Sequence, residues 1–472
     1  MSSTSALNSL LASSSPSSAI DLSSILQAAT GASTSGIDVT SAVNAAVTAA
    51  QAPETAWENQ ESTLQSQTTA LTALQTDATN LDNDMQSLNS VTGPLSARTV
   101  NSSDSSLVTA SAASGATVGN HTVMVNSLAT TASWASGTVA SATTDLAAGS
   151  FTITDATGTT TTISTGTGSS TLSDVASTIN NDDLGVTASV VTDAGGARLA
   201  IVSNTSGTAA NFSVGNGSLT FSQAVTPADA SLTVDGIKLT SASNTVTGAL
   251  PGVTLNLLNA SVGTNVDLTI APDTTQASTA INQFVTDYNT AIADLNTQFT
   301  FSGTGEGVLS GDSDVRSLQM TLQQALDYTN TPASGSTTVS NLSSLGISVG
   351  NDGTLTVDSG TLSNALQSNF SDVQNFFQGT TLNGFANSLD QSLTSFISPA
   401  DGAFTVDLSS INTEYAGLQT DITNFQTNYI VPLQAQLQSE YSQAEILLQQ
   451  LPTEMQQINT ELGLNNNSSN GG

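Results

Sequence analysis

Apolar residues recur at alternating intervals of three and four positions near both ends of the chain, and this pattern constrains the fold more than any other feature. From Trp57 onward, the pattern places one apolar stripe along a helix of roughly 50 Å, at about 1.5 Å per residue. A stripe of this length is buried only against a partner helix, so we expect its residues to form an interface. The N-terminal stripe consists of Leu64, Leu71, Leu74, Leu81, Met85 and Leu88.

The C-terminal region supplies a second stripe with the same spacing. Its members are Ile411, Tyr415, Leu418, Ile422 and Phe425, followed after an interval by Leu448, Leu451, Met455, Ile458 and Leu462. Within the interval, the apolar positions from Tyr429 to Tyr441 are spaced by four, and Pro432 lies inside this shift. Because an interior proline costs a helix about 3 kcal/mol, we predict a kink or break at Pro432, with a further bend at Pro452. An intramolecular hairpin and an intermolecular bundle would bury these stripes equally well, so both remain open.

The middle of the chain has a different pattern. Between Arg98 and about Ile270, short runs of Val, Thr and Ile alternate with period two and are separated by Gly, Asn and Asp, which predicts strands and turns. One helix is expected over residues 172–180, and helices return at Thr275. The predicted fold class is therefore a multidomain α+β protein, in which terminal helices form a coiled-coil or helical-bundle stem and β-rich domains are inserted in the middle.

These patterns also divide the chain into expected domains. A helix should begin at Val39 behind polar caps and pause at Pro53, because the residue before a proline disfavours helical geometry. The expected domains are a flexible N-terminal extension (1–35), N-terminal helices (36–95), a first β-rich domain (96–140 with 225–272), a second β-rich domain (141–224), a helical or mixed leg domain (273–405), and C-terminal coiled-coil helices with a mobile tail (406–472).

Composition excludes several classes of partner and site. The 472 residues include no cysteine, which rules out disulfide scaffolds and thiolate-bound metal centres. Only 4 Lys and Arg stand against 37 Asp and Glu, so a net charge of −33 opposes binding to nucleic acid or to anionic membranes. No apolar run approaches the roughly 20 residues of a membrane span, and the start lacks the pattern of a secretory signal. We therefore expect no nucleic-acid partner, no membrane insertion, and a route of export that needs no cleaved signal peptide.

The candidate catalytic and metal-binding residues are few. His121 is the only histidine, and its position in an expected strand favours a structural role over that of a catalytic base. The acidic segments at 180–183 and 351–353 do not match a calcium-binding loop and are better explained as turns. The glycine-rich segments at 166–168 and 303–307 lack the lysine of a phosphate-binding loop. The sequence predicts no enzyme, with no catalytic residue, metal site or cofactor.

Short motifs occur in a fixed order along the chain, at residues 35–39, 97–104, 119–125, 230–236, 243–246, 250–255, 284–289, 309–313, 345–347 and 352–355. Taken together, these motifs resemble the flagellar hook-associated protein 2 family, also called the flagellar filament cap. Their order and spacing agree with the family over nearly the whole chain beyond residue 35. Within the second β-rich domain, residues 172–207 also resemble a repeat shared by flagellins and cap proteins.

The resemblance implies a structural assembly factor. It implies an annular homo-oligomer at the distal tip of the bacterial flagellum, which promotes flagellin folding and insertion and prevents flagellin loss. The implied partners are flagellin, hook–filament junction proteins and an export chaperone, with extracellular localisation after export by the flagellar type III system. Basic residues that are usual in the family's helices are mostly Gln, Thr and Asn in this chain.

Two other functions remain alternatives from the sequence. A secreted surface adhesin or fibre protein could use a β-rich middle to bind glycans, and cell adhesion could overlap with a role as a cap. Flagellin itself shares terminal helices and a β-rich middle, but its N-terminal Arg-Leu-Ser-Ser-Gly signature and basic C-terminal end are not found in this sequence.

Overall fold

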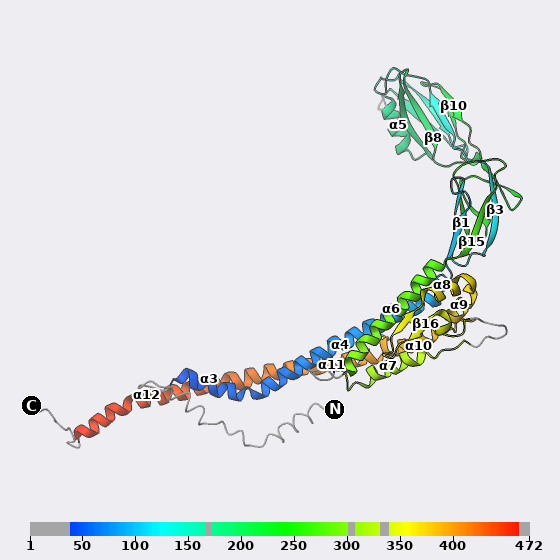
Figure 1. Ribbon diagram of the computed structural model, residues 1–472. Coiled ribbons are helices and arrows are strands. Elements are labelled where there is room, and N and C mark those ends of the chain that lie inside the picture. Colours follow the sequence, from blue (N-terminus) through cyan, green and yellow to red (C-terminus); the bar gives the residue numbers. More distant parts are fainter. Residues whose placement is uncertain (1–37, 167–170, 301–306, 331–338, 462–472) are drawn as a thin grey trace, which may run out of the picture. The chain divides into compact units, whose positions relative to one another are not determined.

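The computed structural model describes residues 38–166, 171–300, 307–330 and 339–461. The expected flexible extension over 1–35, the tail beyond 461 and the loop at 303–306 lie outside the described residues. The chain divides into two compact units, of which unit 1 takes Met1–Thr79, Thr290–Thr321 and Ser392–Gly472, and unit 2 takes Asn80–Asn289 and Leu322–Gln391. The described elements confirm the α+β class, with helices at both ends and strands in the middle (Figure 1).

The N-terminal helices form where the sequence predicts them. Helix α3 (Val39–Ala50) begins behind Asp38, whose carboxylate accepts a hydrogen bond from the backbone N–H of Ser41 at 3.1 Å. Helix α4 (Ala52–Asn89) follows after a single intervening residue, Gln51, so the pause expected at Pro53 lies two residues earlier and the residue before the proline is already helical. Pro53 lies in the first turn of α4, where its missing N–H removes no intrahelical bond.

The first β-rich core joins strands from both sides of the insertion. A five-stranded antiparallel sheet has the order β1 (Arg98–Ser102), β15 (Val266–Pro272), β3 (Gly119–Ser127), β11 (Ala230–Val234), β12 (Ile237–Ser241). A three-stranded sheet has the order β13 (Thr245–Leu250), β14 (Val253–Leu257), β2 (Val108–Ala112). Alternate residues of these strands, such as Val123, Val125 and Leu232, are buried in one shared core.

The second β-rich core has its own sheets and one helix. One sheet has the order β10 (Phe221–Val225), β4 (Ser133–Ser136), β8 (Gly196–Ser203), β7 (Val186–Asp193), and the other has the order β6 (Thr160–Thr165), β5 (Gly149–Thr154), β9 (Ser213–Gly215). Helix α5 (Leu172–Asn181) buries Leu172, Val175 and Ile179 in this core, as its spacing predicts. Asn180 fixes α5 to β7, because its side chain donates to the carbonyl of Ala188 at 2.9 Å and accepts from the N–H of Ala188 at 2.7 Å.

One boundary differs from the sequence expectation. Residues up to 140 were expected in the first β-rich domain, but β4 pairs with β8 and β10 of the second core. The reason is Trp134, which packs against Phe212 and donates its indole N–H to the Phe212 carbonyl at 3.0 Å. The change of core therefore lies between Ala129, which belongs to the first core, and Ala132, which belongs to the second.

The remaining helices complete both units. These are α6 (Thr274–Phe299), α7 (Ser313–Ala325), α8 (Ser359–Ser368), α9 (Phe370–Gln378), α10 (Phe385–Ile397) and α11 (Ala403–Phe425). A small antiparallel hairpin pairs β16 (Ile347–Val349) with β17 (Leu355–Val357). In unit 2, Phe284 and Tyr288 of α6 pack with Phe376 of α9 and Phe385 of α10 in an aromatic cluster. Aromatic residues make up only 4% of the chain, and several of them contribute to this one core.

The C-terminal helices continue through the predicted irregularity. A π-helical turn (η3, Gln426–Ile430) joins α11 to α12 (Val431–Glu461), and Pro432 is the second residue of α12. The π turn accommodates the proline without ending the helix, which accounts for the shift in the apolar stripe. Pro452 lies inside α12, and α12 continues past it.

Candidate assembly interface in the helical stem

The N-terminal stripe is buried along its whole length. Within unit 1, Leu64, Leu71 and Leu74 are at most 6% exposed, and α11 runs antiparallel beside this part of α4 (Figure 1). Within unit 2, Leu81, Met85 and Leu88 are fully buried. We call the paired segments of unit 1, residues 39–79 with residues 403–461, the helical stem.

The C-terminal stripe divides into three parts. Leu418 is buried, whereas Ile411, Tyr415, Ile422 and Phe425 are half-buried against the stem. Leu448, Leu451, Met455 and Ile458 are exposed, and Leu462 lies outside the described residues. The structure therefore brings together the N-terminal stripe and the first part of the C-terminal stripe, but leaves the distal part of α12 uncovered by the described residues.

The π turn moves the stripe by one residue. The spacing of four placed Tyr429 in the stripe, but Tyr429 is 51% exposed and Ile430 is 6% exposed. A π turn adds one residue to a helical turn, so the inward position passes from 429 to 430. Ile430 then packs with Val43 and Val47 of α3, and Leu437 and Tyr441 of α12 pack against the same cluster.

Polar contacts between α4 and α11 use amides instead of cations. Gln60 donates to Glu414 at 2.9 Å, and Gln419 donates to Glu61 at 2.9 Å. Gln426 of the π turn bonds to the buried carboxylate of Glu54. These neutral amides stand where a Lys or Arg would form an ion pair.

An aromatic contact closes the stem beside these bonds. Trp57 of α4 meets Phe425 of α11 edge to face, with ring centroids 5.3 Å apart, and Phe425 stacks on Tyr429 at 5.2 Å. Such pairs contribute about 0.5–1.5 kcal/mol beyond the area that they bury. The sequence pattern included Phe425 but missed Glu54, whose buried carboxylate accepts hydrogen bonds from Gln51 and Gln426.

Carboxyl groups face one another at three places between the helices. In unit 2, burial, together with Asp390 of α10, raises the pKa of Asp82 to about 7, and burial, together with Asp287 of α6, raises the pKa of Asp84 to about 7. In unit 1, burial and the charges of Asp312 and Asp314 raise the pKa of Asp407 to about 6. The periodicity of the sequence gives no signal for these pairs, since facing residues lie on different helices.

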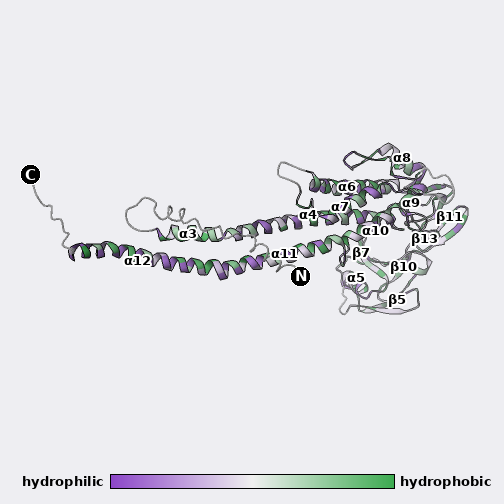
Figure 2. Ribbon diagram, turned by 90° about the horizontal axis from the view of Figure 1, so that it is seen from below, coloured by the Kyte–Doolittle hydropathy of each residue, from purple (hydrophilic) through white to green (hydrophobic). Residues whose placement is uncertain are grey.

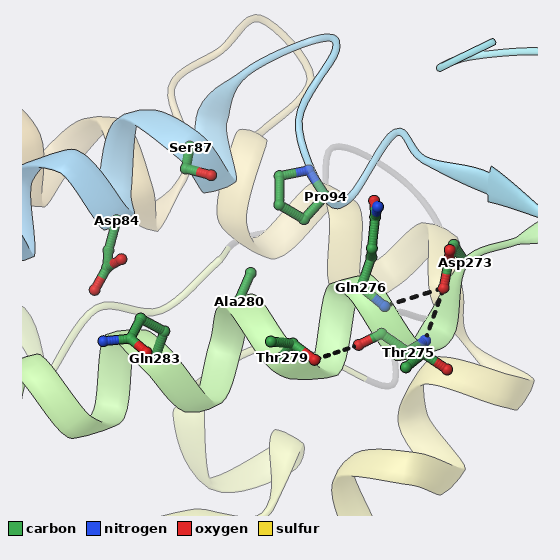
Figure 3. A pocket seen from close by; sticks show the side chains of 9 residues that line it. All are labelled: Asp84, Ser87, Pro94, Asp273, Thr275, Gln276, Thr279, Ala280 and Gln283. Atoms are coloured by element: carbon green, nitrogen blue, oxygen red, sulfur yellow. Dashed lines mark hydrogen bonds between the residues drawn. The ribbon is translucent and has the colours of Figure 1, made fainter.

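Asp84 also lines a groove of about 420 Å³ beside the start of α6 (Figure 3). Asp84, Ser87 and Pro94 line one side of the groove, and Gln283 and other residues of α6 line the opposite side. Asp273 caps α6 by accepting from the N–H groups of Thr275 and Gln276 at 3.1 and 3.0 Å. The carboxylate of Asp273 is thus used in capping the helix.

The candidate chemical residues have structural partners. His121 Nδ1 lies 2.8 Å from the carboxylate of Asp235, which also accepts from the N–H of Thr122, and these bonds lower the pKa of Asp235. Asp235 belongs to the turn between β11 and β12, so the histidine fastens this turn to β3. Asp352 accepts from the N–H and hydroxyl of Thr354 in a turn, as expected for the segment at 351–353.

Neither a metal site nor a membrane-spanning helix is found in the described ranges. Over residues 38–166, 171–300, 307–330 and 339–461, no three His, Cys, Asp or Glu residues gather as metal ligands. Over the same ranges, no helix combines the length and apolar character needed to cross a bilayer. The fold and the stem define an α+β protein, in which β sheets are inserted in the sequence between paired terminal helices.

Comparisons with known proteins identify the family. Residues 35–132 match the model described as flagellar hook-associated protein 2 N-terminus, and residues 227–453 match the model of its C-terminus. Between them, residues 150–205 match the flagellin hook IN motif, which agrees with the repeat recognised in the second β-rich core. The chain belongs to the flagellar hook-associated protein 2 family.

Individual relatives agree with this assignment. The chain is 31% identical over 320 residues to the B-type flagellar hook-associated protein 2 of Pseudomonas aeruginosa, which covers 60% of this chain and 67% of that protein. It is 27% identical over 398 residues to the flagellar hook-associated protein 2 of Aeromonas caviae, covering 76% and 82%. The crystal structure of the D1-D2-D3 domains of the flagellar cap protein from Escherichia coli superposes with a TM-score of 0.59 at 27% identity, covering 73% of this chain and 99% of that one. These matches do not favour the adhesin alternative.

Proposed function

We propose that this protein is an assembly factor that caps the distal end of the bacterial flagellar filament. In this role it promotes the folding and insertion of flagellin and prevents flagellin from escaping. The observation that carries the proposal is the order of the family matches, since the N-terminal model includes one side of the helical stem, the C-terminal model includes most of the other side, and the two models flank the second β-rich core.

The helical stem suits a part that bears load without covalent cross-links. Its leucine stripe is buried, and its polar bonds join Gln to carboxylates across α4 and α11. We propose that the stripe residues Leu64, Leu71, Leu74 and Leu418 hold the two ends of one chain together as a leg that reaches the filament end. Burial of each such leucine contributes about 1.5–3 kcal/mol.

The proposed partners follow from the same role. The protein acts as an annular homo-oligomer, contacts flagellin and the hook–filament junction proteins, and meets an export chaperone before secretion. A chain without cysteine cannot form disulfide cross-links while it passes unfolded through the flagellar type III apparatus to the flagellum tip. The role is structural and requires no catalysis.

Complementation of a cap-deletion strain tests the proposal. Cells that produce this protein are expected to regain filaments and motility and to release less flagellin into the medium. Leu71→Asp should be exported without restoring filaments, whereas Thr72→Asp, one residue further on the exposed side of α4, should restore them. Export of the unaltered protein at normal levels without recovery of filaments would refute the proposed function.

A further inference from the structure

Helix α12 carries an apolar surface that the described chain leaves open. We define the distal stripe as Leu448, Leu451, Met455 and Ile458, whose side chains are 45%, 48%, 56% and 52% exposed. Figure 2 shows hydrophobic residues continuing along α12 past the position of α3. A regular stripe of four large apolar side chains in water needs a covering partner.

The distal stripe repeats the part of α12 that packs against α3. Leu448 follows Ile430 at the same spacing as Met455 follows Leu437, and both Ile430 and Leu437 belong to the cluster around α3. Since this spacing of about 18 residues completes about five turns of a helix, both sets lie on one face. Two apolar positions that pack around α3, Ile430 of η3 and Leu437 of α12, therefore recur on the same face as Leu448 and Met455.

The N-terminal region contains a second copy of the amino-acid sequence that forms α3 and its cap. Residues 18–30 align with residues 35–47 at an offset of 17, and six of the thirteen aligned positions are identical. At four further positions a residue of similar type recurs, such as Leu22 for Val39 and Leu26 for Val43. The identical residues are Ser18, Ile20, Asp21, Ser24, Ala28 and Ala29, which recur as Ser35, Ile37, Asp38, Ser41, Ala45 and Ala46.

The repeated residues are those that shape α3 and its contact. Asp38 caps α3 through the N–H and hydroxyl of Ser41, and both residues recur as Asp21 and Ser24. The buried face of α3 consists of Ala42, Val43, Ala46 and Val47. Its counterparts by the offset are Ile25, Leu26, Ala29 and Thr30, so three of the four remain apolar and two of them are larger.

Continued beyond α3, the antiparallel register of the stem would place residues 18–30 opposite the distal stripe. The two sides of the stem run antiparallel, since Gln75 pairs with Thr405 and Glu54 pairs with Gln426. Residues that precede α4 in the sequence are therefore opposite residues that lie further toward the C-terminus along α12. Leu26 precedes Glu54 by almost the same length of chain as Met455 follows Gln426. At the rise of an α-helix, an offset of about 17 residues corresponds to about 25 Å, and the spacing of about 18 residues on α12 corresponds to about 27 Å. The two sequence repeats therefore match in length.

We propose that residues 18–30 dock on the distal stripe of α12 as a second copy of the α3 contact within the same chain. The covalent link favours the chain's own segment over one from another molecule, because the segment ends shortly before Asp38 and is held at high effective concentration. The stem then extends by one repeat, and the proposal does not depend on the function of the protein as a cap.

Paired cysteines test this contact in the full-length protein, which has no cysteine of its own. Leu26→Cys with Met455→Cys should form an intramolecular disulfide as readily as the reference pair Val43→Cys with Leu437→Cys, which joins α3 to α12 in one apolar cluster. Leu26→Cys with Thr453→Cys is the matched control, since Thr453 is exposed and lies on the other side of α12. Non-reducing gels and mass spectrometry distinguish links within a chain from links between chains.

The outcomes separate the possible occupants of the distal stripe. A link within one chain at Met455 but not at Thr453 supports the proposal. Links only between chains would assign the stripe to a second copy, and equal linking at both positions or none at Met455 would leave residues 18–30 without a docking site; each of these results overturns the proposal.

A second measurement uses Met455→Cys as the single thiol. Adding Leu26→Asp should raise its rate of modification by a maleimide by about tenfold, which corresponds to about 1.4 kcal/mol in the docking equilibrium. Gln27→Asp, at the counterpart of the exposed Asn44, should leave the rate unchanged. Equal rates in the Leu26→Asp variant and its parent would also overturn the proposal.

Discussion

Replacement of Asp82 by Asn is expected to remove a large part of the pH dependence of stability in the helices of unit 2. Asp82 is 7% exposed, faces Asp390 of α10, and accepts a hydrogen bond from Gln86 at 2.8 Å. Burial is the main cause that raises its pKa to about 7, and the neighbouring carboxyl adds to the effect. Asn keeps the size of the side chain and carries no charge at any pH.

The sign and size of the effect follow from proton linkage. Between the ordinary pKa of 3.8 and the folded value of about 7, the folded state holds a proton that the unfolded state lacks. The free energy of unfolding therefore falls by at most about 1.4 kcal/mol per pH unit as the pH rises through this window. Above the window it no longer changes with this group. From pH 5 to pH 7 the loss is at most about 2.7 kcal/mol, and contact with water reduces it to about 1–2 kcal/mol.

Urea unfolding followed by ellipticity at 222 nm, at pH 5, 6, 7 and 8, measures this loss. The Asp82→Asn variant should be more stable than the parent at pH 8 and should lose about 1–2 kcal/mol less between pH 5 and pH 8. Asp421→Asn, at an exposed position of α11, serves as the matched control and should follow the parent curve. If the Asp82→Asn and parent curves run parallel over this range, the reasoning from the facing carboxyl groups is refuted.

Other perturbations test the stem and the two β-rich cores. Leu71→Asp should destabilise the stem by several kcal/mol, seen as early quenching of Trp57 fluorescence in urea, whereas Thr72→Asp should not. Asn180→Ala should destabilise the second core by about 1–3 kcal/mol, because it leaves both backbone groups of Ala188 unpaired, and the transition reported by Trp134 would move accordingly. Added salt should raise the free energy of unfolding of the stem, because screening weakens the repulsion that arises from a net charge of −33 and has little effect on the Gln–carboxylate hydrogen bonds. A fall in stability with added salt would indicate unrecognised ion pairs.

Local sequence patterns were sufficient for most elements. The period of two predicted β5, β7, β8 and β11, and the three-and-four spacing predicted α4, α5, α6 and α11, because each pattern reports which side of a single element is buried. The six residues of the N-terminal stripe are buried for the same reason.

Properties that depend on two elements could not be predicted in this way. The sequence showed that the stripe shifts near Pro432, but only the π turn determines that Ile430 replaces Tyr429 at the inward position. The assignment of β4 to the second core depends on Trp134 meeting Phe212, which is distant in sequence. The facing carboxyl groups of Asp82 and Asp390 have no periodic signal, since each residue alone resembles an ordinary polar position on a helix.

The scarcity of Lys and Arg explains both the Gln–carboxylate hydrogen bonds of the stem and the carboxyl groups that face one another between helices. With 4 Lys and Arg against 37 Asp and Glu, most carboxylates that lie between helices have no cationic side chain within reach. At the edge of the stem the helices satisfy them with glutamine, as at Glu61 and Glu414. Deeper between the helices, carboxyl groups face each other and one of them holds its proton at higher pH. Protonation then replaces the ion pair as the means of burying an acidic side chain, so the helical units should gain stability in mildly acidic surroundings.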